Sequence, residues 1–376
     1  MKLTALSLEN FRNFREVGEV GFPGQGLLVA AAPNAVGKTN FLESIYFLLR
    51  GKSFRAQTVE CVQWGADFFS VKGTVSTQAG SSLLMATYDK DKKILALQEN
   101  GAPASLATFY SRYPFILFLP EDTFMFARGP AARRNFLNTT LAALPHYFSA
   151  LVQYHRVLRQ RNAALKNATL AVDMEVWDQL LAEYAALLWD QRALFVQFLA
   201  THLPRVYKDM GGKSEHLEIR FIPGAADSKD FRTILAQSFA QESRYKHTLY
   251  GAHRDDLAVW QDGHQVQTAL SRGQTRLLTI ALKIVAYQYV KQVLKEEPLL
   301  LLDEVLSELD EDTQHALLDH LPATQTLLTC TKLPRELRGR SGVHMIDLRA
   351  ILPPPSVQET KVATPTVAQT PVPVKA

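Results

Sequence analysis

The chain has 376 residues, of which 47% are hydrophobic and 21% are charged, and its formal net charge is +4. This is the composition of a globular protein with a substantial buried core, and it excludes a chain that is disordered throughout. A net charge this small does not by itself indicate nucleic-acid binding, so any contact with DNA must come from local basic patches. The two cysteines, Cys61 and Cys330, argue against a disulfide scaffold and fit a reducing cytosol.

The N-terminal segment alternates between apolar and polar side chains, which predicts a β-strand and not a signal peptide. No uncharged apolar run approaches the ~20 residues that a membrane-spanning helix needs. We therefore expect a soluble, cytoplasmic protein that makes no contact with a membrane.

Residues 1–125 are rich in predicted strands and contain a phosphate-loop unit. Residues 26–31 form a short apolar run typical of a buried strand, and residues 40–49 have the spacing of a helix with one apolar face. Alternating segments within residues 68–98 predict an antiparallel sheet beside a parallel core.

The segment from Pro33 to Thr39 joins this strand to this helix and has the parts of a phosphate loop. Lys38 is expected to reach the outer phosphates of ATP, and Thr39 to hold Mg²⁺. Ala32 and Ala35 stand where such loops usually have glycine, and alanine at a positive φ costs roughly 1 kcal/mol, which would lower nucleotide affinity. A chance Gly-Lys-Thr triplet is the alternative. The residues expected to contact the nucleotide here are Asn34, Ala35, Val36, Gly37, Lys38, Thr39 and Asn40.

Residues 126–245 have a helical texture, and no glycine occurs between Gly129 and Gly211. We expect this part to be a helical lobe inserted into a discontinuous head that comprises residues 1–125 and 246–352. Residues 353–376 include six prolines and no aromatic residue, which predicts a disordered tail with the role of a linker.

Several arginines of the lobe are candidates for DNA contacts. In a helix over residues 151–166, Arg156, Arg159 and Lys166 lie away from the apolar face and form a stripe that could contact phosphates. A solvated helix face is the alternative. Arg161 falls within the apolar face, which favours a buried structural ion pair.

Two other charged segments lie near the start of the lobe and just after its end. Arg133 and Arg134 are adjacent and point to different sides, so one is expected to pair internally while the other faces DNA or a partner subunit. His253, Arg254 and the two aspartates that follow lack the further ligands of a metal site, and a network that fixes the junction of lobe and head is the favoured role.

Ser271 is a good cap for a long helix predicted over about residues 272–296. The start of such a helix offers free N–H groups and the positive end of the helix dipole, and Gly273 allows a close approach to a phosphate. This segment lies far in sequence from the phosphate loop, so we expect it to bind the γ-phosphate of ATP held by a second molecule. An ordinary capped helix is the alternative. The residues of this signature segment are Ser271, Arg272, Gly273 and Gln274.

Four leucines at residues 299–302 predict a buried strand, and Asp303 and Glu304 follow at its carboxyl end, where α/β proteins bind ligands. Asp303 is expected to orient the Mg²⁺ shell, and Glu304 to act as general base on the attacking water or to polarise it. Two solvated residues at the start of a loop are the alternative. A helix is expected from Ser307 onward.

With these residues in view, the chain resembles the RecF family of ABC-type, SMC-like ATPases over residues 1 to about 350. The resemblance implies an α/β fold: an ABC-type P-loop ATPase head with an antiparallel β subdomain and an inserted helical lobe, lobe II. The stretches that carry it are Leu8–Phe14, Gly37–Glu43, Arg133–Leu137, Tyr154–Asn162 and Gly251–Asp256.

The resemblance also implies a function. Members of the family dimerise in an ATP-dependent manner on DNA gaps or junctions of double- and single-stranded DNA. There they work with RecR and RecO to help RecA load, in recombinational repair and replication restart. It implies that Arg12 contacts the nucleotide and that Ser307 and Asp310 face the opposite subunit.

The chain departs from the ABC pattern at several positions. Phe54 stands where relatives often have histidine, residues 326–331 contain no switch histidine, and residues 120–122 replace a glutamine after the strand at 115–118. We therefore expect weak, slow, DNA-stimulated ATP hydrolysis. A DNA-binding module that binds ATP but hydrolyses it poorly is the alternative. A transporter ATPase subunit fits less well because of the inserted lobe.

Overall fold

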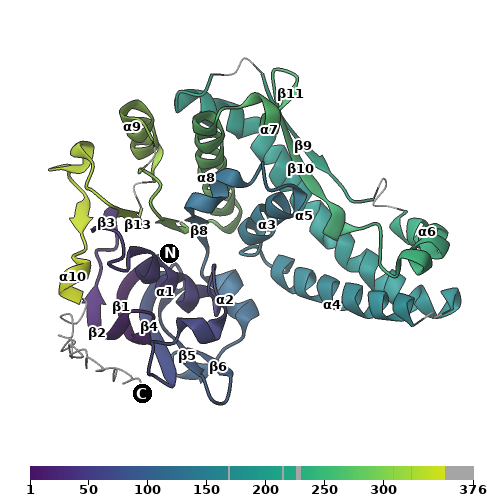
Figure 1. Ribbon diagram of the computed structural model, residues 1–376, viewed down its shortest axis with the longest axis horizontal. Coiled ribbons are helices and arrows are strands. Elements are labelled where there is room, and N and C mark those ends of the chain that lie inside the picture. Colours follow the sequence, from purple (N-terminus) through teal and green to yellow (C-terminus); the bar gives the residue numbers. More distant parts are fainter. Residues whose placement is uncertain (168–169, 214–215, 226–229, 308, 323, 352–376) are drawn as a thin grey trace, which may run out of the picture.

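The computed structural model describes residues 1–167, 170–213, 216–225, 230–307, 309–322 and 324–351. The predicted tail at residues 353–376 lies outside the described residues, as does Glu308, which falls within the helix expected from Ser307 onward. Figure 1 shows a head built on two sheets and, at the other end of the molecule, a lobe dominated by helices.

The centre of the head is a parallel sheet whose middle strands are buried on both faces. Leu299 and Leu301 pack into one hydrophobic core together with the first helix, while Leu300 and Leu302 pack into a second core on the opposite face. This explains the uninterrupted run of leucines, because a strand covered on both faces does not alternate with polar residues. The strands in spatial order are β14 (Val343–Met345), β3 (Leu27–Ala31), β13 (Thr326–Cys330), β12 (Leu299–Leu302) and β8 (Phe115–Phe118).

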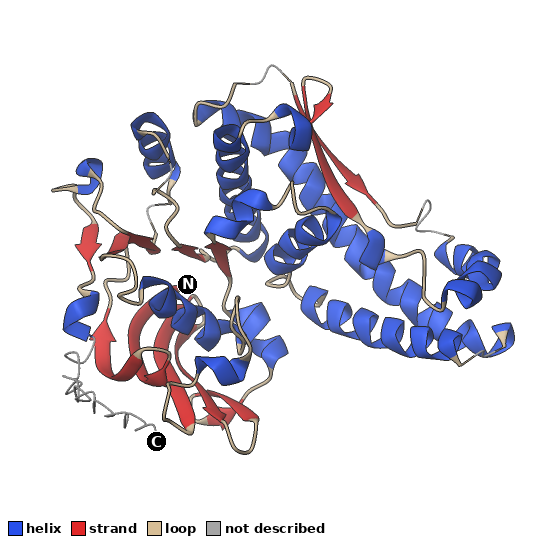
Figure 2. Ribbon diagram, in the orientation of Figure 1, coloured by secondary structure: helices blue, strands red, loops and turns tan. Residues whose placement is uncertain are grey.

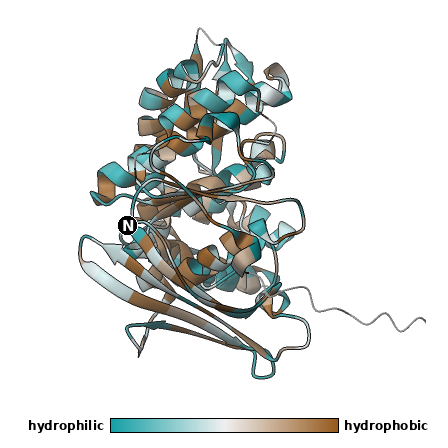
Figure 3. Cartoon of the chain, turned by 90° about the vertical axis from the view of Figure 1, so that its left-hand side faces the viewer, coloured by the Kyte–Doolittle hydropathy of each residue, from teal (hydrophilic) through white to brown (hydrophobic). Residues whose placement is uncertain are grey.

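An antiparallel sheet forms the other layer of the head, and α1 (Lys38–Arg50) lies between the two sheets. Phe47 of α1 meets Phe69 of this sheet edge to face, with ring centroids 4.9 Å apart. In Figure 3 the most hydrophobic ribbons run through the middle of the head. The strands in spatial order are β2 (Phe14–Gly21), β1 (Lys2–Phe11), β4 (Phe68–Thr77), β5 (Gly80–Asp89), β6 (Ile94–Glu99) and β7 (Ala102–Pro103), and α2 (Leu106–Arg112) follows them.

The lobe combines long helices with a small antiparallel sheet (Figure 2). β9 (Leu217–Ile222) pairs with β10 (Asp256–Gln261), and β11 (His264–Gln265) completes the sheet. The expected boundary between residues 245 and 246 therefore falls between two strands that pair with each other. The helices are α3 (Pro130–Leu141), α4 (Tyr147–Lys166), α5 (Glu175–Asp209) and α6 (Phe231–Tyr245).

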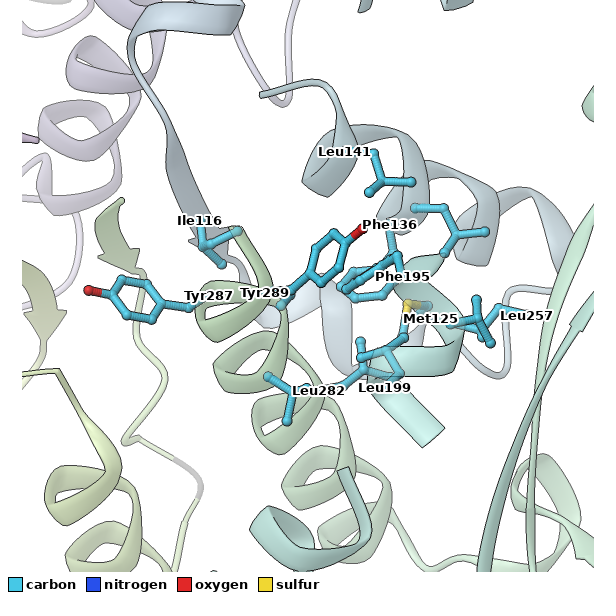
Figure 4. Close-up of a cluster of buried hydrophobic side chains, with 14 of the residues drawn as sticks. Ile116, Met125, Phe136, Leu141, Phe195, Leu199, Leu257, Leu282, Tyr287 and Tyr289 are labelled. Atoms are coloured by element: carbon cyan, nitrogen blue, oxygen red, sulfur yellow. The ribbon is translucent and has the colours of Figure 1, made fainter. Parts of the chain in front are cut away.

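The helix α8 (Arg272–Leu294) joins head and lobe. Its Tyr289 lies against Phe195 of α5, with ring centroids 4.9 Å apart, in the cluster drawn in Figure 4. Among the described residues α8 alone is long and apolar enough to cross a membrane, and 72% of its apolar window is buried inside the fold. Its apolar composition is accounted for by this packing.

The helix expected from Ser307 begins later in the structure. It is α9 (Glu311–His320), and Asp310 caps it by accepting a hydrogen bond from the Thr313 N–H at 2.8 Å. Aspartate is a strong helix cap, whereas Ser307 donates its hydroxyl hydrogen to the carbonyl of Glu304 within the preceding turn. The remaining elements are α7 (Val266–Ala269), α10 (Leu348–Ile351) and the 3₁₀ turns η1 (Thr58–Cys61), η2 (Pro120–Phe124), η3 (Ala171–Met174), η4 (Ala252–Arg254) and η5 (Arg335–Leu337).

Candidate nucleotide-binding site

The phosphate loop leads from β3 into α1, which begins at Lys38. Gly37 has a φ of 105°, and a Cβ at this position would lie 2.5 Å from the side-chain nitrogen of Asn13, so only glycine fits. Ala35 has a φ of 67°, which is the strained conformation considered above, whereas Ala32 is not among the positive-φ residues. The substitution of glycine therefore strains the loop at one alanine and not at the other.

Lys38 is buried and turned back onto its own loop. Its Nζ donates hydrogen bonds to the carbonyls of Ala32 at 2.6 Å and Pro33 at 3.2 Å. The same Nζ forms an ion pair with Glu304 Oε1 at 2.8 Å. The loop lysine and the acidic strand end, 266 residues apart by sequence number (304 minus 38), are thus in direct contact.

Asp303 lies between two threonine hydroxyls. Thr39 Oγ1 donates to Asp303 Oδ2 at 2.9 Å, and Thr329 Oγ1 donates to Oδ1 at 2.6 Å. Burial raises the pKa of the Asp303 carboxyl, and the hydrogen bonds from Thr329 and Thr39 oppose that rise. A threonine hydroxyl beside a carboxylate is the oxygen donor set that Mg²⁺ uses in phosphate sites, so these residues fit the cation.

Lys38, Thr39 and Glu304 line one cleft of about 750 Å³, and the buried Asp303 is connected to it by its hydrogen bond with Thr39. Besides Lys38 and the start of α1, the cleft is lined by the cationic side chains of Arg55 and Arg276. Its charge therefore suits a polyanion such as a nucleoside triphosphate. Arg55 and Arg276 were not singled out in the sequence, although Arg276 lies only two residues beyond the signature segment. The lining residues are Asn13, Asn34, Ala35, Gly37, Lys38, Thr39, Asn40, Arg55, Pro120, Arg276, Glu304, Ser307 and Thr331.

Arg12, expected at the nucleotide, has other partners in this structure. Its guanidinium donates to both carboxylate oxygens of Glu43, at 2.9 and 2.7 Å, and to the carbonyl of Glu60 at 2.7 Å. Neither Arg12 nor Val36 is among the residues that line the cleft.

The signature segment lies outside the cleft of its own chain. Ser271 accepts a hydrogen bond from the Gln274 N–H at 3.3 Å, and Gln274 Oε1 accepts one from the Ser271 N–H at 2.9 Å, so the two residues form a capping box. Arg272 and Gly273 are exposed, as is Asp310. The positive end of α8 is therefore available to a group from outside this chain.

The five DNA candidates divide by exposure. Arg156, Arg159 and Lys166 are exposed on one side of α4. Arg133 is 4% exposed and its guanidinium binds Asp256 through two hydrogen bonds of 2.7 and 2.8 Å, so of the two adjacent arginines it is the one that pairs internally, and it is not exposed for DNA contact in this structure. Arg134 is partly exposed and donates to the carbonyl of Asp255 at 2.8 Å.

The segment after the lobe is a structural network. His253 contacts the Tyr154 hydroxyl through Nδ1 at 2.8 Å and the Thr248 carbonyl through Nε2 at 3.1 Å. Asp255 is buried and accepts hydrogen bonds from Arg192, from the Trp189 indole and from the Gly224 N–H. Within the described residues no cluster of three or more metal-ligating side chains occurs.

The family model of the RecF/RecN/SMC N-terminal domain matches residues 2–332 of this chain. The DNA replication and repair protein RecF of Moorella thermoacetica is 36% identical over 359 residues, which are 93% of this chain and 95% of that protein. The chain belongs to the RecF family. The RecF protein of Staphylococcus aureus strain JH9 is 32% identical over 375 residues, covering 94% of this chain and 100% of that one.

Solved RecF structures share the fold. A structure of the recombination mediator protein RecF-ATP has a TM-score of 0.81 at 27% identity and covers 89% of this chain and 93% of that one. A second structure, described as RecF-ATPrS, has a TM-score of 0.80 at 26% identity and covers 92% of this chain and 96% of that one. An SMC head bound to the C-winged helix domain of ScpA, at 13% identity and a TM-score of 0.54, is similar in fold alone. The expected ABC-type, SMC-like head is confirmed.

Proposed function

We propose that the chain is an ATP-controlled DNA clamp of replication and repair. ATP binding joins two copies on DNA gaps or double- and single-stranded junctions, and slow, DNA-stimulated hydrolysis releases them. The observation that carries this proposal is the meeting of Lys38, Thr39 and Glu304 in one cleft, with Asp303 hydrogen-bonded to Thr39 and the signature segment turned outward. RecF relatives are described as DNA replication and repair proteins, and a RecF-ATP structure is described as part of the RecFOR pathway.

The residues of the cleft divide the chemistry among them. ATP bound with Mg²⁺ supplies the phosphoanhydride bond that is hydrolysed. Lys38 neutralises charge on the outer phosphates, while Thr39 and Asp303 hold the cation. Glu304 accepts a proton from the attacking water. The loop from Asn34 to Asn40 cradles the phosphates with backbone N–H groups.

Closure of the site requires a second copy. The exposed N-terminus of α8, from Ser271 to Gln274, binds the γ-phosphate held by the other chain, and Asp310 lies in the contact between the two. On the lobe, Arg156, Arg159 and Lys166 contact DNA phosphates. RecR, RecO and RecA are the partners in this scheme, and the cytoplasm is its location.

Two observations favour the alternative, a DNA-binding module that binds ATP but hydrolyses it poorly. Lys38 is already paired with Glu304, and Ala35 strains the loop, so both affinity and turnover have a barrier to overcome. In that case ATP acts mainly as a structural ligand of the dimer.

The deciding experiment measures ATP hydrolysis with and without double-stranded DNA over a range of protein concentrations, alongside Lys38→Ala. A DNA-stimulated rate per protein that rises with concentration and disappears in Lys38→Ala supports the clamp. ATP binding without turnover supports the alternative, and no ATP binding contradicts both.

Dimerisation is tested separately by sedimentation velocity with ATP. Ser271→Arg is expected to bind ATP and remain monomeric, because its side chain occupies the phosphate position at the start of α8. Ser111→Arg, on the exposed face of α2, is the matched control and should dimerise like the wild type. Equal dimerisation of Ser271→Arg would contradict the proposed role of α8.

A further inference from the structure

The central strand β13 ends beside both halves of the nucleotide site. It pairs with β3, which leads into the phosphate loop, and with β12, which leads into Asp303 and Glu304. Because parallel strands bring their carboxyl ends to the same edge, the last residues of β13 lie next to both acids. Two threonines occupy this end, Thr329 within the strand and Thr331 after it.

Thr329 is 1% exposed and uses its hydroxyl twice. It donates to Asp303 Oδ1 at 2.6 Å and accepts from the Glu304 N–H at 3.0 Å. Glu304 has a φ of 49°, a conformation that is uncommon for a residue with a side chain and needs support from its surroundings. Thr329 gives that support to the backbone from which the Glu304 side chain projects.

Thr331 acts on the side chain itself. Its hydroxyl donates to Glu304 Oε2 at 3.1 Å, while Lys38 holds Oε1 at 2.8 Å. Both Thr331 and Glu304 line the cleft. If Lys38 exchanges Glu304 for a phosphate, the Thr331 hydroxyl is placed to hold the carboxylate near the phosphate loop.

We propose that Thr331 is the positioning residue for Glu304 during hydrolysis, and that Thr329 positions Asp303 for the cation. Thr331 can do this because it directly follows β13 and its hydroxyl contacts the Glu304 carboxylate. The inference rests on the proposed function, because it assumes that Glu304 activates water. The competing account is that both hydroxyls only complete the turn at the end of the strand.

The test compares steady-state ATP hydrolysis of wild type, Thr331→Val and Thr331→Ser. Valine keeps the shape and removes the hydroxyl, so kcat should fall roughly tenfold to a hundredfold while KM and ATP binding change less than about twofold. Serine keeps the hydroxyl and should restore kcat to within about threefold of wild type. A purely structural role predicts loss of thermal stability without this split.

Thr329→Val is measured in parallel against the Mg²⁺ concentration. It should raise the Mg²⁺ concentration needed for half-maximal rate, because Asp303 loses a fixed partner, whereas Thr331→Val should leave that concentration unchanged. Thr329→Ser controls for folding at this buried position. Equal Mg²⁺ dependence in all variants would overturn the assignment of Thr329.

The outcomes separate this inference from the function on which it rests. A wild type without turnover contradicts hydrolysis itself. A wild type whose turnover is abolished by Glu304→Gln but unaffected by Thr331→Val overturns only the role of Thr331. A loss in Thr331→Val that serine does not restore also overturns it, because the hydroxyl is then not the required group.

Discussion

One residue, Ala35, introduces backbone strain into the phosphate loop. Ala35 keeps a side chain in a left-handed conformation that glycine adopts freely. Ala35→Gly is therefore expected to raise the free energy of unfolding by about 1 kcal/mol and to tighten ATP binding. Ala32→Gly, at a position without a positive φ, is the matched control and should not stabilise the protein. Urea denaturation and ATP titration measure both effects, and equal behaviour of the two variants would show that Ala35 stores no strain.

His253 makes stability depend on pH. The Thr248 carbonyl can only accept a hydrogen bond, so the Nε2 of His253 carries the hydrogen. The Nδ1 of the neutral ring therefore accepts a hydrogen bond from the Tyr154 hydroxyl. Burial lowers the pKa of His253 from 6.5 to about 4. Between these values the unfolded chain binds a proton that the folded chain does not, so this contribution to stability is present above pH 6.5 and is lost as pH falls towards 4.

The expected loss approaches about 3 kcal/mol at the acid end of that window. His253→Gln should be less stable than wild type at neutral pH and should show a smaller fall in stability on acidification. Urea midpoints at several pH values measure the difference. Parallel curves for the two proteins would mean that other groups cause the acid sensitivity.

The sequence predicted the residues of the site that a local motif contains. Lys38 and Thr39 follow a strand and begin a helix, and Asp303 and Glu304 end a run of leucines, so each can be read from its neighbours. The roles of Thr329, Thr331 and Arg55 depend on which strand or loop lies next to them. The structure shows β13 between β3 and β12, and no short pattern in the sequence carries that order.

At the scale of elements, Arg161 links three helices of the lobe. It lies on α4, is fully buried, and forms ion pairs of 2.6 Å with Asp178 of α5 and with Glu242 of α6. The sequence predicted a buried pair from its place on the apolar face, and the structure confirms it. The partners could not be predicted, because their choice depends on how α5 and α6 pack against α4.

Arg161→Ala should lower the free energy of unfolding by about 3–5 kcal/mol, since it leaves buried Glu242 without its cation. Arg159→Ala, exposed two residues away on the same helix, is the matched control and should change stability by less than about 0.5 kcal/mol. Urea denaturation of both variants measures the contrast. Equal stability would show that the pair contributes nothing net to the lobe.

The sequence predicted which long helices and strands exist better than it predicted where they begin or which strands pair. α8 and β12 follow from strong apolar patterns, whereas α9 begins at Glu311, where Asp310 caps it while the Ser307 hydroxyl is bonded to the Glu304 carbonyl. The pairing of β9 with β10 joins segments on either side of α6. Such a pairing is fixed by packing, and it places part of the segment after residue 245 within the lobe.

At the scale of the whole molecule, DNA binding is expected to be electrostatic and to depend on the exposed stripe of α4. Replacing Arg156, Arg159 and Lys166 by glutamine should weaken binding and lower the slope of log K against log salt by about 0.9 for each DNA phosphate that the protein no longer neutralises. The matched control replaces Arg205 and Lys208, exposed on α5, by glutamine. Fluorescence anisotropy across a salt series measures both slopes. An unchanged slope in the stripe variant would assign DNA binding to another surface.

The hairpin of α4 and α5 gives the fold freedom to vary in length. The two helices pack along each other and extend from the head as a projecting pair. The cleft lies at the other end of the molecule, where β3, β12, β13 and α1 build it. Turns of helix added in register at the tip would lengthen the projection and leave the partners of Lys38 and Glu304 unchanged. Related chains can therefore differ in the length of this helix pair through an insertion at its tip alone. Such an insertion needs no compensating change in the residues that line the nucleotide cleft.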